Sequence, residues 1–306
     1  MKKLPIGIQT FEKLIKGDFV YADKTKYVYD LVNTESAYFL SRPRRFGKSL
    51  LLSTFEALFS GPPDPDGPPQ SLFKDLWIGK ETKYDFSQKF PVINLSLTSE
   101  TFNPEALTKS LNTKLNDINE DEELNLKMAD LPGTDLPRVI KRLHRKYNSK
   151  VVVLVDEYDA PISGNLDNLE LAQKNRDILK DFYSGFKDTD KYLRFVFITG
   201  VTRYAFMGLS AGLNQLIDIT LESKFSDICG FTHEEFKTCF AEYFPPALED
   251  VRKNNTISPK ASVLDLQKKI LDMYDGYTWD GLTKVLNPFS VLNFFRNYKF
   301  NAFWMN

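Results

Sequence analysis

The chain has 306 residues, 42% of them hydrophobic, which is enough for one large α/β domain and a smaller unit around a sizeable core. Its 40 basic and 41 acidic residues give a net charge of −1, which excludes a general electrostatic attraction to nucleic acid or to an anionic membrane. Two cysteines, Cys229 and Cys239, and two histidines, His144 and His233, are too few and too poorly spaced to indicate a zinc site, and structural disulfides are not expected either. The N-terminus lacks an apolar signal segment, and no run of about 18 apolar residues indicates a membrane span. We therefore expect a cytoplasmic protein that does not contact a membrane.

The first 36 residues contain the polar motif Tyr21-Ala22-Asp23-Lys24-Thr25, ahead of a helix expected at residues 27–32. Aspartate or threonine before a helix usually caps its free amide groups. The alternative is a role beside a bound nucleotide. An apolar strand is expected next, at residues 37–41.

That strand leads into Ser41-Arg42-Pro43-Arg44-Arg45-Phe46-Gly47-Lys48-Ser49. This sequence ends like the phosphate-binding pattern G-x-x-x-x-G-K-[ST], but Arg42 stands where the pattern has its first glycine. In such a loop Gly47 lets the backbone approach a phosphate, Lys48 reaches the β- and γ-phosphates, and Ser49 can ligate Mg²⁺. Because Arg42 has a Cβ atom, we expect the entrance of the loop to differ from the pattern.

Three further residues of the loop, Arg44, Arg45 and Phe46, are expected to border a bound nucleotide. The two arginines either add positive charge near the phosphates or face solvent. A helix is expected after the loop, because apolar residues recur at helical spacing. They are Leu51, Phe55, Leu58 and Phe59.

The middle of the chain alternates expected strands and helices. Residues 62–69 are rich in proline and should form a surface loop, residues 91–96 a strand, and residues 104–118 and 137–147 two helices. The acidic run at residues 120–123 is expected to be a solvated face, with a metal site as the alternative. Basic residues of the second helix form either a solvated face or a surface for a partner; they are Lys141, Arg142, Arg145 and Lys146.

Residues 151–155 are all apolar and mostly β-branched, which indicates a strand buried on both faces. Two carboxylates, Asp156 and Glu157, follow at its C-terminal end, where open α/β sheets bind their ligands. Asp156 is suited to hold Mg²⁺, and Glu157 to orient an attacking water or accept its proton. The phosphate loop and this pair, in this order and each after an apolar strand, together indicate a nucleotide site.

A helix is expected at residues 171–186, followed by a strand at residues 193–200 and a possible edge strand at residues 216–221. Thr199 and Arg203 end the first of these strands, which should lie beside the two earlier strands of a parallel sheet. A polar group there can sense the γ-phosphate, so both residues are candidates for the catalytic site. The alternative is that Thr199 only satisfies backbone groups.

The chain becomes mainly helical after Gly230. Thr232 and Glu235 have the spacing of a capping box for a helix that Pro245 and Pro246 are expected to end. Two more amphipathic helices are expected at residues 264–274 and 288–298. The sequence thus predicts an α/β domain at residues 1–229, with a parallel sheet flanked by helices, and a smaller helical region at residues 230–306.

Eight separated motifs resemble the AAA-ATPase-like family of bacteria, and they occur in order along nearly the whole chain. They are Ile6-Gly7-Ile8-Gln9, residues 21–25, residues 41–49, Val155-Asp156-Glu157-Tyr158-Asp159, Ile198-Thr199-Gly200-Val201-Thr202-Arg203, Gly212-Leu213-Asn214-Gln215-Leu216, Tyr274-Asp275-Gly276-Tyr277 and Asn287-Pro288-Phe289-Ser290-Val291-Leu292.

The resemblance implies a P-loop NTPase fold of the additional-strand type, with Lys48 and Ser49 on phosphate and magnesium and Asp156 and Glu157 at the second motif. It also accounts for Arg42, because the family's loop commonly reads R-P-R-R-F-G-K-S. Members often continue into a nuclease-like domain of the PD-(D/E)XK type, which this chain is expected to lack.

The favoured hypothesis is a Mg²⁺-dependent ATPase in which hydrolysis is coupled to a conformational change. The alternative is a nucleotide-dependent switch or interaction module with negligible turnover. A third reading, an ATPase that serves an absent nuclease domain on nucleic acid, has little support from the balanced charge. A second copy of the chain or another protein is a possible partner.

Overall fold

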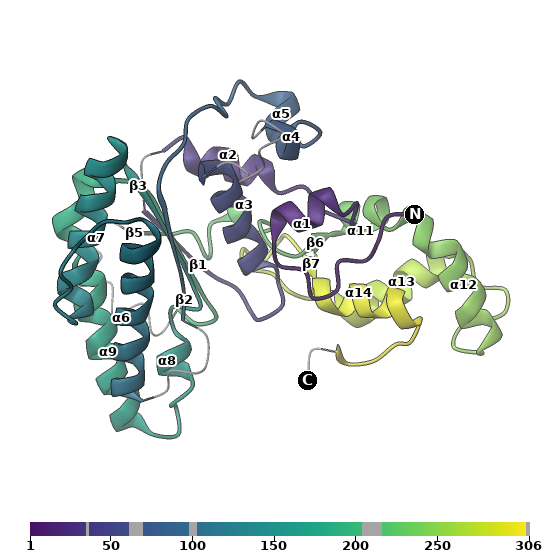
Figure 1. Cartoon of the computed structure of the whole chain (residues 1–306). Coiled ribbons are helices and arrows are strands. Elements are labelled where there is room, and N and C mark those ends of the chain that lie inside the picture. Colours follow the sequence, from purple (N-terminus) through teal and green to yellow (C-terminus); the bar gives the residue numbers. More distant parts are fainter. Residues whose placement is uncertain (35–36, 61–69, 98–102, 204–215, 304–306) are drawn as a thin grey trace.

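A five-stranded parallel sheet forms the centre of the larger part of the molecule (Figure 1). The computed structural model describes residues 1–34, 37–60, 70–97, 103–203 and 216–303. The strand order is β2-β3-β4-β1-β5. This order places β4 between β1 and β3, which is the additional-strand arrangement implied by the resemblance. The strands are β1 (Ala37–Ser41), β2 (Val92–Ser96), β3 (Val151–Asp156), β4 (Leu193–Gly200) and β5 (Leu216–Asp218).

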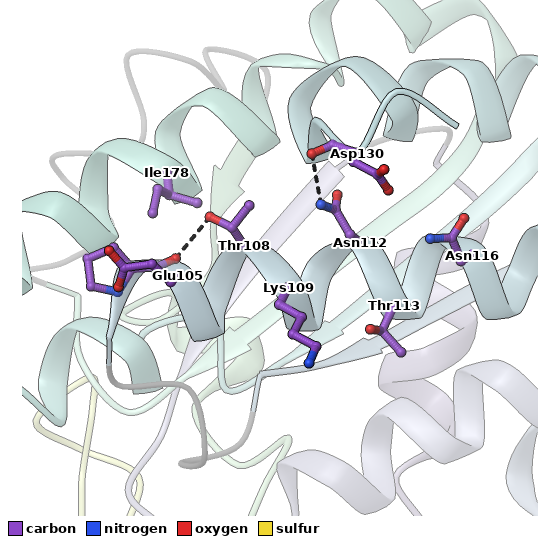
Figure 2. Close-up of a pocket in the computed structure, with 9 residues that line it drawn as sticks. Glu105, Thr108, Lys109, Asn112, Thr113, Asn116, Asp130 and Ile178 are labelled. Atoms are coloured by element: carbon purple, nitrogen blue, oxygen red, sulfur yellow. Dashed lines mark hydrogen bonds between the residues drawn. The ribbon is translucent and has the colours of Figure 1, made fainter. Parts of the chain in front are cut away.

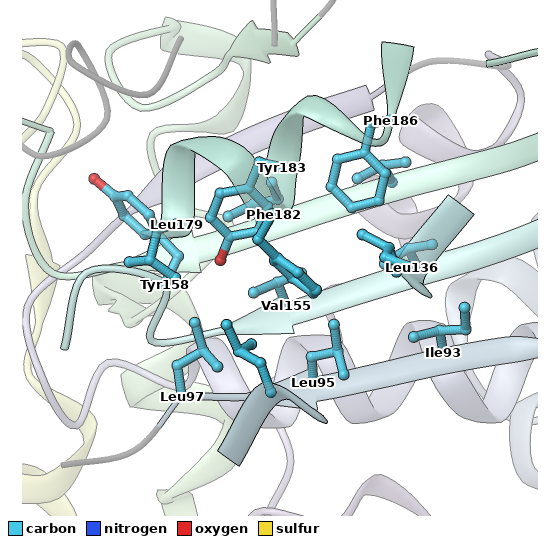
Figure 3. Close-up of a cluster of buried hydrophobic side chains, with 14 of the residues drawn as sticks. Ile93, Leu95, Leu97, Leu136, Val155, Tyr158, Leu179, Phe182, Tyr183 and Phe186 are labelled. Atoms are coloured by element: carbon cyan, nitrogen blue, oxygen red, sulfur yellow. The ribbon is translucent and has the colours of Figure 1, made fainter. Parts of the chain in front are cut away.

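Both faces of the sheet are buried because successive side chains of a strand point to opposite sides. In β3, Val151, Val153 and Val155 pack with α6 (Pro104–Asp121), α7 (Pro132–Tyr147) and α9 (Leu169–Ser184) on one face (Figure 3). Val152 and Leu154 of the same strand belong to the cluster on the other face, which contains residues of α3 (Lys48–Ser60). Figure 1 shows the helices on either side of the sheet. The predicted α/β fold is confirmed.

Short helices surround α3 on its face of the sheet. They are α1 (Phe11–Lys16), α2 (Thr25–Val32), α4 (Gln70–Phe73) and α5 (Trp77–Glu81). The apolar stripe predicted for α3 is confirmed, since Leu51, Phe55, Leu58 and Phe59 are all buried. The short helix α8 (Ala160–Ser163) and the 3-10 turns Lys187–Tyr192 and Ser223–Phe225 connect the other elements.

One predicted helix starts earlier than the sequence indicated. Helix α7 begins at Pro132 rather than at Pro137, which lies inside it. Both prolines suit a first helical turn, where a missing N–H costs no hydrogen bond, and the pattern alone did not show which one starts the helix. The solvated-face interpretation of residues 120–123 fits the structure, because Glu120, Asp121 and Glu123 are exposed, while the half-buried Glu122 forms an ion pair with Lys146 of α7. No group of three or more potential metal ligands occurs among the described residues, so the alternative of a metal site there finds no support.

The C-terminal region is built mainly from helices and contains one small antiparallel sheet. Its elements are β6 (Phe231–Thr232), α11 (His233–Cys239), the 3-10 turn Ala241–Tyr243, α12 (Phe244–Lys253), α13 (Val263–Tyr274), β7 (Val285–Leu286) and α14 (Pro288–Asn297). The capping box of Thr232 and Glu235 is confirmed. The prediction that Pro245 and Pro246 end a helix was wrong, because both lie in the first turn of α12, where proline is well tolerated.

The N-terminal segment belongs to both parts of the molecule. Val20 and Ala22 pack in the same buried cluster as residues of α11 to α14. Lys24 donates hydrogen bonds to the backbone oxygen of Asp227 at 2.7 Å and to the Glu235 carboxylate of α11. The division of the chain between residues 229 and 230 therefore stays a prediction.

Two predictions fall on residues outside the described ranges, the proline-rich loop at residues 62–69 and most of the motif at residues 212–216. Across the described parts of the chain, no helix is long and apolar enough to cross a membrane.

Candidate functional site

Three predicted motifs meet at the C-terminal edge of the sheet. In the parallel register, Ser41 of β1 lies opposite Gly200 of β4, and β3 ends at Asp156 on the other side of β4. The loop after β1, the carboxylates after β3 and Thr199 are thereby brought together. This edge is where open α/β sheets bind their ligands.

The backbone of the phosphate loop has the conformation that the sequence predicts, with a glycine in a left-handed conformation directly before a helix. Gly47 has a φ of +97°, a conformation that residues with a side chain rarely adopt, and α3 begins at Lys48. Lys48 is buried, and its Nζ donates hydrogen bonds to the carbonyl oxygens of Arg42 at 2.9 Å and Pro43 at 3.0 Å. Burial lowers the pKa of Lys48. Its ammonium group is therefore held within the loop.

Asp156 is fixed by donors from each of the neighbouring motifs. Its Oδ2 accepts a hydrogen bond from Ser49 Oγ at 2.5 Å, and its Oδ1 accepts from Thr199 Oγ1 at 2.6 Å and from the backbone N–H of Glu157 at 3.0 Å. The predicted metal ligands Ser49 and Asp156 thus lie in direct contact. The hydroxyl of Thr199 is buried and donates to this carboxylate. The sensing role predicted for Thr199 stays a prediction.

Glu157 lies beside Asp156 but points into a cavity. Its backbone φ is +53°, in the left-handed region. Partial burial, followed by the nearby charge of Asp156, raises the pKa of the Glu157 carboxyl, while the charges of Lys48 and Arg44 act against this rise. A carboxyl with a raised pKa is better matched to proton transfer near neutral pH than a free glutamate.

Two residues after Glu157, which the sequence analysis did not assign, attach it to β4. Asp159 is buried, and its carboxylate accepts hydrogen bonds from the backbone N–H groups of Val201 and Thr202 and from Thr202 Oγ1. Tyr158 donates its hydroxyl to the carbonyl of Thr202 at 2.7 Å. The fixed position of these two residues constrains the chain at Glu157. Both belong to motifs quoted above, but their pairing appears only once the two strands are adjacent.

The cavity has a volume of about 420 Å³, within the usual range for small-molecule sites. Its polar end is formed by Arg44 to Ser49 of the loop and by Glu157. The remaining walls are mostly apolar and come from the N-terminal segment and the C-terminal region. The sequence analysis gave residues 21–25 a role beside a nucleotide as an alternative only, and it did not place the C-terminal region there. The residues of these walls include Pro5, Gly7, Ile8, Gln9, Val20, Tyr21, Lys24, Cys229, Gly230, Phe231, Phe289 and Leu292.

The three loop residues that were predicted to border a nucleotide, Arg44, Arg45 and Phe46, have different surroundings. Arg44 is exposed and lines the cavity. The guanidinium carbon of Arg45 lies 4.0 Å from the centre of the Phe289 ring, and Phe46 is buried beside Tyr277 and Trp279, with ring centroids 4.7 and 5.5 Å away. Arg45 and Phe46 also line the cavity, but their main contacts are with the C-terminal region.

Arg203 lies away from the cavity. Its guanidinium forms an ion pair with Asp218 of the edge strand β5 at 2.7 Å, and Arg203 does not appear among the described residues that line the cavity. The catalytic role predicted for it stays a prediction.

The polar motif at residues 21–25 has a capping role in the structure. Asp23 accepts hydrogen bonds from the backbone N–H groups of Thr25 and Trp77, and Thr25 Oγ1 accepts one from the N–H of Ile78. These two side chains therefore serve the starts of α2 and α5. Tyr21 and Lys24 of the same motif line the cavity, so the motif also contributes to its wall.

A second cavity, of about 580 Å³, lies along α6 and is a shallow groove lined by short polar side chains (Figure 2). Asn112 donates to the carbonyl of Asp130 at 2.8 Å, and Thr108 to that of Pro104 at 2.9 Å. It contains none of the predicted site residues. The cavity at the phosphate loop is therefore the better candidate for the functional site.

The strand order, the loop and the carboxylates after β3 define an α/β protein with a P-loop NTPase fold. A family model described as predicted AAA-ATPase matches residues 5–210. A protein of Azotobacter chroococcum mcd 1, described as an uncharacterized protein in the vnfD 5' region, is 36% identical over 307 residues, which is 99% of this chain and 54% of that protein. The chain belongs to the AAA-ATPase-like family and spans about half the length of this relative. Membership of this family implies nucleotide binding.

Proposed function

We propose that the chain is an ATPase that binds ATP with Mg²⁺ in the cavity at the phosphate loop and hydrolyses it. The observation that carries the proposal is the convergence of Lys48, Ser49 and Glu157 from two strand ends at the polar end of the cavity, with Asp156 hydrogen-bonded to Ser49 behind them. Each is the residue type that phosphoryl transfer needs at that place. The apolar walls opposite them suit the base of a nucleotide.

Lys48 and the loop amides would hold the phosphates. The hydrogen bonds of Lys48 Nζ to the carbonyl oxygens of Arg42 and Pro43 keep this charge beside the loop. A β- or γ-phosphate can replace these two oxygens as the acceptor or share the ammonium group with them. The start of α3 directs its free N–H groups to the same place, which favours an anion. Arg44 adds a further positive charge at the cavity wall.

Ser49 and Asp156 fit a magnesium site. A hydroxyl and a carboxylate are hard oxygen donors, and Mg²⁺ is usually held by one or two such groups together with phosphate oxygens and waters. The hydrogen bond between Ser49 Oγ and Asp156 Oδ2, at 2.5 Å, places these two oxygens side by side, which supports this assignment. Bound there, Mg²⁺ would offset negative charge on the phosphates.

Glu157 would act as the general base. It lines the cavity, stands next to the metal carboxylate and has a raised pKa, so it can accept a proton from an attacking water. Its two neighbours Tyr158 and Asp159 hold the chain in place on β4. We infer that the resulting loss of the γ-phosphate changes how the loop and its neighbours pack.

A nucleotide-dependent switch with negligible turnover is the second candidate. One observation favours it, namely the small number of arginines at the cavity. Among the described residues only Arg44 and Arg45 line it, and the guanidinium of Arg45 lies on the Phe289 ring. Efficient transferases of phosphoryl groups often use an arginine to stabilise the transition state. A second copy of the chain or another protein that supplies one would then be required for turnover.

Mg²⁺-dependent ATP turnover and nucleotide binding test the proposal in the wild type, Lys48→Ala and Glu157→Gln. We expect Lys48→Ala to lose binding, and Glu157→Gln to keep binding while kcat falls by about 10²- to 10⁴-fold. Lys26→Ala is the matched control, because Lys26 is exposed and does not line the cavity. Binding without turnover in the wild type would favour the switch, and no nucleotide binding would overturn both candidates.

A further inference from the structure

Arg42, which stands where the phosphate-loop pattern has a glycine, is directed away from the cavity. The residue is fully buried and is not among the described residues that line the cavity. Its Nη1 donates to the carbonyls of Ser41 at 2.8 Å and Thr220 at 2.9 Å, and its Nη2 to the carbonyl of Phe225 at 2.9 Å. Its charge therefore does not serve as a phosphate ligand.

The Arg42 guanidinium lies against the indole of Trp279. The guanidinium carbon is 4.0 Å from the ring centre, a distance at which the ring face attracts a cation. These three hydrogen-bond acceptors are backbone carbonyls rather than carboxylates, and burial lowers the pKa of Arg42 to about 10. Backbone carbonyls and the Trp279 ring are the direct contacts of this buried charge, and the more distant carboxylates of Asp218 and Asp227 also favour it.

The turn that carries Trp279 is itself held in one conformation. The Asp280 carboxylate accepts hydrogen bonds from the backbone N–H groups of Leu282 at 2.9 Å and Thr283 at 2.7 Å, and from Thr283 Oγ1 at 2.8 Å. Tyr277 of the same turn accepts from the N–H of Val285 at 3.0 Å. The indole is therefore presented to Arg42 by an ordered element of the C-terminal region.

Arg42 is linked directly to the lysine of the site. Its backbone carbonyl accepts a hydrogen bond from Lys48 Nζ, while its backbone N–H donates to Gly200 at 3.1 Å. At the other end of the loop Phe46 packs on Tyr277 and Trp279, and its carbonyl accepts from the N–H of Gly230 at 3.2 Å. The same aromatic turn thus contacts the loop at two positions, Arg42 and Phe46, which both precede Gly47 and Lys48.

We infer that Arg42 and Trp279 are positioning residues, which set the conformation of the phosphate loop and make nucleotide binding dependent on a turn of the C-terminal region that does not line the cavity. The inference rests on the proposed nucleotide site. It also explains why an arginine can stand at position 42, where the pattern has a flexible glycine: the contact with Trp279 fixes the conformation of the loop at this position. Nucleotide binding and the packing of residues 277–279 then favour each other.

Binding of MgADP and of a non-hydrolysable ATP analogue with Mg²⁺ tests this inference in Trp279→Leu and Trp279→Phe. We expect Trp279→Leu to raise Kd at least tenfold, because a leucine has no aromatic face for Arg42, and Trp279→Phe to keep most of the affinity. Arg42→Lys, which keeps the charge but loses the planar stacking group, should resemble Trp279→Leu. Phe244→Leu is the matched control, because Phe244 is more deeply buried in the C-terminal region and packs on Phe236 and Phe295.

A general loss of stability is separated from a positioning role by two further measurements. The melting temperature of each variant is compared with its Kd, and amide exchange of residues 44–49 is measured without nucleotide. We expect faster exchange of these amides in Trp279→Leu but not in Phe244→Leu.

The inference is overturned if Trp279→Leu binds nucleotide like the wild type, or if Phe244→Leu loses as much affinity. A wild type that binds no nucleotide would instead overturn the proposed function, and with it the dependence on Trp279. Unchanged exchange in Trp279→Leu would show, in either case, that Trp279 does not order the loop.

Discussion

At the scale of single residues, the hydroxyl of Thr199 acts on the site through Asp156. It is buried and donates at 2.6 Å to Oδ1, while Ser49 occupies Oδ2 of the same carboxylate. A donor behind a metal-binding carboxylate fixes the direction of its free electron pairs. The position of Thr199 at the end of β4 is thus explained without direct contact between its hydroxyl and a phosphate.

Replacing Thr199 by valine removes this hydrogen bond while keeping the shape of the side chain. We expect the apparent affinity for Mg²⁺ in the presence of ATP to fall by about 10- to 100-fold, the usual effect of losing a group that orients a metal ligand. Thr199→Ser keeps the hydroxyl and should restore most of it. The Mg²⁺ concentration for half-maximal turnover gives the measurement. Equal Mg²⁺ requirements in Thr199→Val and the wild type would show that Asp156 needs no such support.

At the scale of elements, the ends of β3 and β4 are held together by more than the sheet. Asp159 accepts hydrogen bonds from three donor groups of Val201 and Thr202, and the Tyr158 ring lies against Gly200. A Cβ atom on Gly200 would lie 2.3 Å from Tyr158 Cε1 and 2.7 Å from Asp159 Oδ1. Position 200 therefore has to be a glycine if the two strand ends are to approach this closely.

Gly200→Ala should separate these strand ends. We expect the free energy of unfolding to fall by about 1–3 kcal/mol, as for other overpacked sites, and kcat to fall because Glu157 shifts with Tyr158. Urea denaturation and single-turnover kinetics measure the two effects. Tyr158→Phe is the control, because it keeps the ring and loses only the hydrogen bond to Thr202. Wild-type stability and rate in Gly200→Ala would refute the close-packing argument.

Most helices and strands were predictable from the sequence, whereas the side-chain contacts between them were not. The strand at residues 151–156 and the start of α3 follow from runs and spacings of neighbouring residues, and these local signals predicted Lys48, Ser49, Asp156 and Glu157 as one site. The inward direction of Arg42 depends on Trp279, which is more than two hundred residues away in the sequence, and the role of Asp159 depends on which strand lies beside β3. No local pattern contains that information.

At the scale of the whole molecule, the cavity is completed by parts of the chain that the predicted division at residue 229 separates. Val20 and Ala22 pack with Phe231 and the C-terminal helices, while Phe46 of the loop packs on Tyr277 and Trp279. Phe289 and Leu292 of α14 line the same cavity as Lys48. The two parts therefore share buried apolar surface as well as a site, which makes the C-terminal region part of the nucleotide-binding unit.

A fragment of residues 1–229 is expected to lose nucleotide binding and a cooperative unfolding transition. Removing residues 230–306 exposes Val20, Ala22 and Phe46 to water and leaves the Arg42 charge without its aromatic partner, and burial of apolar surface is the main term in stability. Near-ultraviolet circular dichroism during urea unfolding and MgADP calorimetry measure both properties. Co-expression with residues 230–306 as a separate chain is the control, and it should restore binding if the contacts rather than the covalent connection are needed. A fragment that unfolds cooperatively and binds MgADP like the full chain would establish instead that residues 1–229 form an independent domain.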